Sequence, residues 1–145
     1  MRKIKFRGKN KDGVWHYGGY VEYLGKPRIV NEVNDGPLNA LAPQQVIPET
    51  IGQFTGLLDR NGKEIYESDI VMNKNAEVFV IVYRGGGFCA MSPKEYCLDL
   101  AGYPVTISEP LGERQSADYL QEQSWVIGNV HARSELLDVL EVKDG

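Results

Sequence analysis

Residues 46–71 constrain the fold more than any other part of this sequence. An apolar alternation from Thr50 to Leu57 indicates a half-buried strand, whose glycines leave room for a neighbouring strand or a bulge. Residues 59–63 then have the composition of a tight turn, because aspartate accepts backbone N–H groups and Asn61-Gly62 supplies a positive φ. A second strand pattern returns through Val71. We therefore expect a strand, a turn and a return strand, with the rest of the chain packed around them.

Several oxygen-bearing side chains occur within this stretch, and they could serve either the backbone or a metal. The candidates are Asp59, Asn61, Glu64, Glu67 and Asp69. A calcium loop of the EF-hand type needs glycine at its sixth position and a ligand at its fifth. Counted from Asp59, glycine comes fourth and Lys63 fifth, so turn chemistry is the better interpretation. We expect no metal and no cofactor.

Length and composition suit one soluble domain over residues 1–145. The two cysteines, Cys89 and Cys97, have neither metal-type spacing nor the density of a disulfide scaffold. No apolar run approaches the ~20 residues that a membrane-spanning helix requires. Lys5, Arg7 and Lys9 interrupt any apolar core of a signal peptide. These features predict a reduced, cytoplasmic protein that does not contact a membrane.

Charge is distributed unevenly. Residues 1–11 carry six basic side chains and no acidic one, whereas the remainder carries ten basic and twenty acidic side chains. An acidic body argues against a broad nucleic-acid surface, because such binding depends on lysine and arginine at phosphates. For the first strand, expected over 1–7, we predict an edge position with Lys3, Lys5 and Arg7 facing solvent and Ile4 and Phe6 facing inward.

The next strand, expected over residues 14–23, is rich in aromatic side chains and has a Gly18-Gly19 pair that suits a bulge. Its aromatic residues are typical of core or sheet-face packing. They could instead form a stacking platform for bases. In that alternative, a nucleic-acid site would combine the basic first strand with these aromatics: Lys3, Lys5, Arg7, Trp15, Tyr17 and Tyr20.

The remaining patterns are mostly those of strands. Further strands are expected over 26–33, 77–83, 88–91, 105–107 and 124–130, with a loop over 34–45. The continuous apolar run 77–83 predicts a strand covered on both faces. Ser92, with glutamate three residues later, predicts a helix that stops at Gly102, and Ser134 can cap a helix over 135–140. The chain is thus predicted to be mainly β, a small barrel-like or sandwich fold with one or two short helices, including a C-terminal one.

Three motif-like blocks occur in order along the chain. They are Ile4-Lys5-Phe6-Arg7-Gly8-Lys9 with Trp15 and Tyr17-Gly18; residues 50–56 continuing through 61–67 to 69–71; and Val126-Ile127-Gly128-Asn129-Val130 before Glu135-Leu136-Leu137. Together they resemble the YopX family of phage and prophage proteins, from whose pattern this chain departs at Ser68, usually glycine, and at Arg133-Ser134. The resemblance implies a β-rich, barrel-like fold and a place in the cytoplasm of a bacterial host cell. It carries no established activity and no catalytic or ligand residues.

The sequence offers no catalytic motif, so we expect a non-enzymatic binding or adaptor protein that acts on a host or viral protein. The alternative is a nucleic-acid accessory factor that uses the basic strand and nearby aromatics. A homo-oligomer built through sheet edges or the C-terminal helix is compatible with either role. Glu67 and Asp69 lie two apart and could form a carboxylate pair; whether they and Gln53 line a cleft is a question for the structure.

Overall fold

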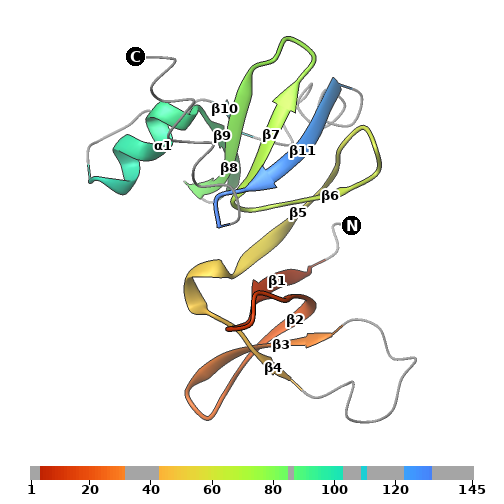
Figure 1. Ribbon diagram of the computed structural model, residues 1–145, viewed down its shortest axis with the longest axis vertical. Helices are drawn as coiled ribbons and strands as arrows, with labels where there is room; N and C mark the ends of the chain where they lie inside the picture. Colours follow the sequence, from red (N-terminus) through yellow and green to blue (C-terminus); the bar gives the residue numbers. More distant parts are fainter. Residues whose placement is uncertain (1–3, 32–42, 85–86, 103–108, 111–122, 132–145) are drawn as a thin grey trace. The chain divides into compact units, whose positions relative to one another are not determined.

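The computed structural model describes residues 4–31, 43–84, 87–102, 109–110 and 123–131 (Figure 1). By its internal contacts the chain divides into two compact units, Met1–Gly56 and Leu57–Gly145. The strands form two antiparallel sheets, and the fold is mainly β with one short α-helix in the described part, as predicted. The prediction of a single domain stays a prediction, because two compact units can still unfold as one cooperative domain.

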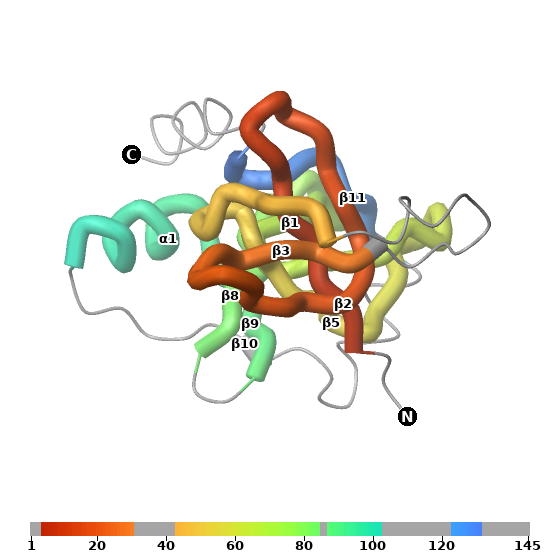
Figure 2. Tube along the Cα trace, turned by 90° about the horizontal axis from the view of Figure 1, so that it is seen from below, coloured from red at the N-terminus to blue at the C-terminus, as the bar shows by residue number. Residues whose placement is uncertain are grey.

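The first unit is built on an antiparallel sheet in which β1 lies between β2 and β5. Its strands β1, β2 and β3 lie close together in Figure 2. This six-stranded sheet has the order β4-β3-β2-β1-β5-β6. Its elements up to β5 are β1 (Phe6–Lys9), β2 (Trp15–Tyr23), β3 (Lys26–Asn31), β4 (Gln44–Gln45), the 3-10 turn η2 (Pro48–Thr50) and β5 (Gly52–Leu58). The β1–β2 turn begins at Asn10, whose Oδ1 accepts hydrogen bonds from the backbone N–H groups of Asp12 and Val14, each at 2.9 Å.

The predicted facing of the first strand is wrong. Lys5 and Arg7 are only 8% and 5% exposed, whereas Ile4 is 73% exposed. The physical reason is the position of β1, which is paired on both sides and is therefore not an edge strand. The Arg7 guanidinium lies 4.8 Å from the centre of the Trp15 ring, so the ring covers a charge that an edge strand would have left in water.

The glycine pair in β2 does not form the expected bulge. Gly18 pairs with both Phe6 and Asn31, and the register with β3 continues without a shift from Gly18 to Tyr23. A close approach of two chain segments occurs instead at Gly8. A Cβ built there would lie 2.8 Å from Cγ2 of Val46, a buried side chain, so only glycine fits.

The second unit contains the turn that the sequence predicts most directly. β5 ends at Leu58, β6 covers Glu64–Tyr66 and β7 covers Asp69–Asn73. Asp59 Oδ1 accepts hydrogen bonds from the N–H groups of Asn61 and Lys63, at 2.8 and 2.9 Å, and Gly62 has a φ of 78°. The strand, turn and return strand are confirmed, with residues 48–50 forming a 3-10 turn where the alternation begins.

The sheet of the second unit has a core on each face. Its order is β10-β9-β8-β7-β11, formed by β8 (Val78–Arg84), β9 (Gly87–Met91), β10 (Glu109–Pro110) and β11 (Ser124–Asn129) together with β7. On β8, Val80 and Val82 belong to one buried cluster and Ile81 to the other. The prediction that this strand is covered on both faces is confirmed.

The helix α1 (Pro93–Leu100) follows β9 and contacts β8 (Figure 1). Ser92 Oγ accepts a hydrogen bond from the Glu95 N–H at 3.1 Å, which is the predicted N-cap. The Glu95 carboxylate accepts a hydrogen bond from Ser92 Oγ at 3.1 Å. Gly102 has a φ of 88° and follows the helix end, as expected. The strand expected over 105–107 and the helix over 135–140 lie outside the described residues.

Candidate functional site

The aromatic residues of β2 lie on two opposite faces of the sheet. Because the register of β2 has no shift, residues of odd number share one face and residues of even number share the other. Trp15 and Tyr17 therefore lie on the face opposite Tyr20. Of the predicted nucleic-acid set, Arg7 shares the face of Trp15 and Tyr17 and lies against the Trp15 ring. Lys5 and Arg7 are buried, Tyr20 lies on the other face, and Lys3 is outside the described residues.

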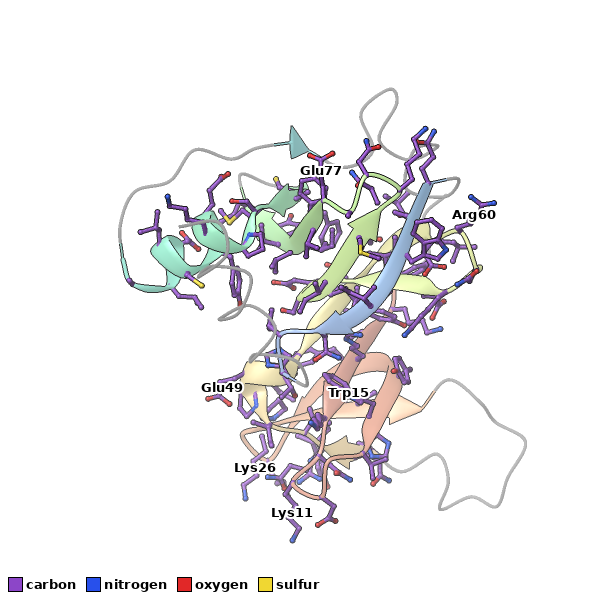
Figure 3. All side chains as sticks on the ribbon, turned by 45° about the horizontal axis from the view of Figure 1, so that its top comes forward. Lys11, Trp15, Lys26, Glu49, Arg60 and Glu77 are labelled. Carbon is purple, nitrogen blue, oxygen red and sulfur yellow. The ribbon has the colours of Figure 1, made fainter. Side chains whose placement is uncertain are left out.

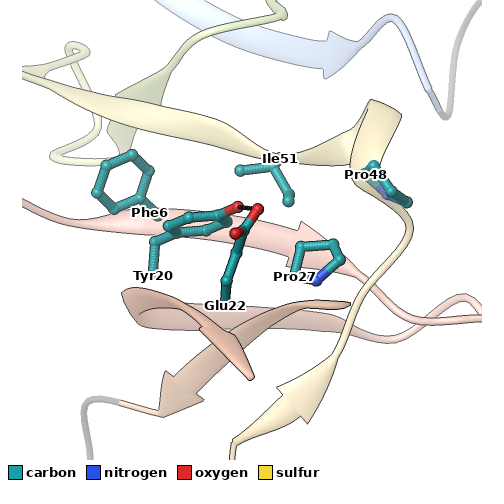
Figure 4. A pocket seen from close by; sticks show the side chains of 6 residues that line it. All are labelled: Phe6, Tyr20, Glu22, Pro27, Pro48 and Ile51. Carbon is teal, nitrogen blue, oxygen red and sulfur yellow. Dashed lines mark hydrogen bonds between the residues drawn. The ribbon is translucent and has the colours of Figure 1, made fainter. Parts of the chain in front are cut away.

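A pocket of about 430 Å³ opens on the Tyr20 face (Figure 4). Its walls come from four segments of the first unit: β1, β2, β3, and η2 with the residue that precedes β5. The lining residues are Phe6, Tyr20, Glu22, Pro27, Pro48 and Ile51. The rings of Phe6 and Tyr20 lie 5.7 Å apart at 48°, so they form a continuous apolar wall.

The η2 side of the pocket is fixed to β1 by backbone and hydroxyl hydrogen bonds. Ile47 donates its N–H to the Lys9 carbonyl at 2.8 Å, and Lys9 donates its own N–H to Thr50 Oγ1 at 2.9 Å. The N–H of Ile51 donates to the Pro48 carbonyl at 3.2 Å. Because Thr50 is buried and donates its hydroxyl to the Ile47 carbonyl at 2.6 Å, this wall is held without any group from a ligand.

Among the described lining residues the carboxylate belongs to Glu22, which pairs with Pro27 across the β2–β3 ladder. The Tyr20 hydroxyl donates a hydrogen bond to Glu22 Oε1 at 3.4 Å (Figure 4). Partial desolvation of the hydroxyl, followed by the charge and the hydrogen bond of Glu22, raises the pKa of Tyr20. Tyr20 therefore stays a neutral donor, and Glu22 supplies negative charge at the rim of an apolar hollow.

The opposite face of the same strands combines cations with aromatic rings. The Lys9 ammonium lies 5.8 Å from the centre of the Trp15 ring, and the Arg28 guanidinium lies 5.6 Å from the centre of the Tyr23 ring. Tyr23 is 57% exposed, and Lys26, its cross-strand partner, is also exposed (Figure 3). This face attracts negative charge, whereas the pocket face attracts positive charge.

Of the three polar residues considered for a shared cleft, the structure assigns a role to Asp69. Asp69 is 1% exposed, and its Oδ2 accepts the Tyr66 N–H at 2.7 Å, as expected for backbone satisfaction. Gln53 is paired with Phe6 within the first unit, whereas Glu67 and Asp69 belong to the second. Within the described ranges, no three His, Cys, Asp or Glu side chains are grouped so that they could hold a metal ion. The helices of that same part of the chain are too short or too polar to cross a membrane.

Comparison with known proteins gives a family and a fold. The sequence profile of the family described as YopX protein matches residues 5–138. The chain belongs to the YopX family. A solved structure, the protein EF1440 from Enterococcus faecalis, is similar to this chain with a TM-score of 0.55 and 23% sequence identity, over 94% of this chain and 99% of that one. At that identity the likeness shows the fold alone. No curated protein matches this sequence.

Sequence reasoning missed the pocket of this YopX-family chain. Its apolar wall is contributed by residues from four separate segments, which no spacing along the chain connects. One signal was present in the sequence. Pro27 and Pro48 have no backbone N–H to donate to a neighbouring strand, so they are not expected at central positions of a sheet. Proline in a strand pattern indicates the edge or the start of a strand. Only the strand register places Pro27 beside Glu22.

Proposed function

We propose that this YopX-family protein is a phage or prophage accessory protein and a non-enzymatic binding module. Its pocket on the first unit takes a short apolar segment of a host or viral protein. The observation that carries the proposal is the pocket itself, lined by five apolar or aromatic residues and a single carboxylate. Aromatic-lined grooves recognise extended, proline-rich peptides in other protein folds.

The charge of the pocket favours a particular peptide. Glu22 is exposed and lies at the rim, so a lysine or arginine beside the apolar residue of the ligand would pair with it. Among the described residues that line the pocket, none is a serine, cysteine or threonine nucleophile or a histidine base, which supports binding in preference to catalysis at this place. The expected ligand is therefore an apolar, proline-containing segment flanked by a basic residue.

The proposal is tested by selecting peptides from a displayed random library on the immobilised full chain. Synthetic copies of the enriched peptides are then titrated by calorimetry. We expect enriched sequences that combine an apolar or proline residue with a neighbouring lysine or arginine. Charge reversal by Glu22→Lys should weaken such a peptide by about tenfold, since it replaces an attraction worth up to ~1 kcal/mol by a repulsion of similar size.

A matched control is available in the same unit. Glu49 is exposed, lies in η2 and does not line the pocket, so Glu49→Lys makes the same charge change without touching the site (Figure 3). Affinity of the Glu49→Lys variant should match that of the unchanged chain. The proposal fails if no peptide is enriched, or if the two variants lower the affinity equally.

A further inference from the structure

The fold restricts the two neighbouring glycines of β2 to different degrees. Gly18 is buried, has a φ of 154° and pairs with strands on both sides. Gly19 is exposed and is not among the positive-φ glycines of the described residues, and a Cβ built on it would meet nothing within 4 Å. Neither backbone conformation nor space requires a glycine at position 19. A glycine inside a strand weakens that strand, and one use for it is the close approach of a ligand.

Gly19 lies in the middle of a face that is aromatic, basic and open to solvent, which we call the Gly19 face. Its members are Trp15, Tyr17, Gly19, Val21 and Tyr23 of β2 and Lys26, Arg28 and Val30 of β3. Tyr17 and Val21 flank Gly19 along the strand, about 7 Å away on either side by strand geometry. Tyr17 is 40% exposed, and Val30 is the cross-strand partner of Gly19. The missing side chain leaves a flat floor between an aromatic ring and two valines.

The charge around this floor identifies the kind of ligand. None of the eight residues of the Gly19 face is acidic, and Glu22 of β2 lies on the opposite face. The first unit as a whole carries eight basic and five acidic side chains, a net charge of +3, whereas the second carries eight basic and fifteen acidic, a net charge of −7. The unit that bears the aromatic floor therefore has a net positive charge, because it carries fewer acidic side chains than the second unit.

We propose that the Gly19 face binds single-stranded nucleic acid. A base lies flat on the Gly19 floor and stacks against Tyr17. Phosphates along the bound strand are neutralised by Arg28 and Lys26 on one side and, on the other, by Lys9, the β1 partner of Trp15. Aromatic side chains and basic groups on an open sheet are the combination by which single strands are bound without sequence preference. Stacking requires a planar ligand, and the cations require a negatively charged one; a single strand supplies both.

This surface differs from the basic first strand that the sequence suggested. It does not depend on Lys5 or Arg7, which are buried, and it excludes Tyr20, which lies in the peptide pocket on the other face. The proposal therefore stands independently of the peptide-binding role.

The test is fluorescence anisotropy with labelled oligothymidylate and oligouridylate, titrated with the full chain at low and moderate salt. Binding should weaken with salt with a logarithmic slope of about −2, as expected if three cations each neutralise one phosphate of a single strand. Gly19→Val should lower the affinity by about fivefold or more, because its side chain fills the floor on which the base stacks. Tyr17→Leu should give a loss of similar size.

A second glycine provides the control. Gly87, at the start of β9, also has open space at its Cβ and no positive φ, so Gly87→Val makes the same change away from the Gly19 face. It should leave the affinity unchanged, and thermal melts should show that both glycine variants are folded. The proposal is overturned if the unchanged chain binds neither oligonucleotide at low salt, or if Gly19→Val binds as tightly as Gly87→Val.

Discussion

The Asp59 carboxylate accepts a hydrogen bond from the backbone N–H of Val126, 67 residues further along the chain, with a distance of 2.9 Å. The same side chain holds its own turn through the N–H groups of Asn61 and Lys63. Asp59 is 2% exposed, and the neighbouring Arg60 N–H donates to the Ser124 carbonyl at 2.9 Å. One turn residue therefore fixes both the local reversal and the position of β11.

Replacement of Asp59 by alanine should destabilise the protein by about 2–4 kcal/mol. Three backbone N–H groups lose their acceptor, and hydrogen bonds to a charged group contribute ~1.5–3 kcal/mol each before water replaces some of them. Urea denaturation followed by circular dichroism measures the loss. Asp12→Ala is the control, since Asp12 lies in an exposed turn. Equal stability of the Asp59 and Asp12 variants would contradict the role given to this carboxylate.

Ser68→Gly should stabilise the protein. Ser68 has a φ of 76°, in a region that costs a non-glycine residue ~1–2 kcal/mol. The Ser68 N–H donates a hydrogen bond to the Ile81 carbonyl, and the Ser68 carbonyl accepts one from the Val130 N–H. Neither bond involves the side chain. After the entropy cost of glycine, a gain of about 0.5–1 kcal/mol remains, measurable as a rise in Tm.

The opposite substitution at position 68 tests the same explanation. Ser68→Val should destabilise by about 1–3 kcal/mol, because a β-branched side chain is poorly tolerated at positive φ. If valine and glycine at this position give the same Tm, the backbone conformation is not what limits stability there.

Gly8→Ala should lower stability, whereas Gly19→Ala should not. The added Cβ at position 8 would lie 2.8 Å from Val46, which is 3% exposed and cannot move freely. Overpacking of this kind costs about 1–3 kcal/mol. At position 19 the Cβ meets open space, so alanine should be neutral or stabilise by up to ~1 kcal/mol. Thermal denaturation of the two variants side by side checks the difference in sign.

The stability of the protein should fall as pH rises above 10, in part because of Tyr96. Burial raises the pKa of Tyr96, partly offset by Arg84 and reinforced by Cys97, Asp99 and Glu67. Its contribution is complete below the unfolded pKa of 10.0. Above that pH the unfolded chain releases the Tyr96 proton while the folded chain keeps it, so the free energy of unfolding decreases until the folded pKa is passed.

Tyr96→Phe should make the free energy of unfolding less dependent on pH between 9 and 11, as measured by urea titrations at several pH values. Tyr83→Phe is the control, because it removes a hydroxyl from a residue that is 43% exposed and keeps the edge-on contact of its ring with Phe88. If the free energy of unfolding of the Tyr96→Phe variant falls with pH as steeply as that of the Tyr83→Phe variant, Tyr96 is not the source of the pH dependence.

Several elements were predictable because their signals are local. The turn at Asp59–Lys63 depends on an aspartate acceptor and a glycine within five residues, and the start of α1 depends on Ser92 and Glu95 within four. The burial of β8 on both faces follows from its unbroken run of apolar residues. In each case the interacting groups are neighbours in the sequence, so the interactions that determine the local structure occur within one short segment.

The facing of β1 was not predictable in this way. Alternation of charge and apolar residues favours an exposed edge, but β1 pairs with β2 on one side and with β5 on the other, and β5 comes more than 40 residues later in the chain. Arg7 is buried because Trp15 lies over it, and no spacing rule connects those residues. The pocket was missed for the same reason.

The sequence by itself determined that the chain is mainly β, where its tightest turns lie and which family it resembles, since each follows from neighbouring residues or from ordered motifs. Tertiary structure alone decided which residues of β1 and β3 share a face with Tyr20 and which share one with Tyr17. It also placed Glu22 beside Pro27 and left an open floor at Gly19. These depend on strand register, and a shift of one residue would exchange the two faces of β2.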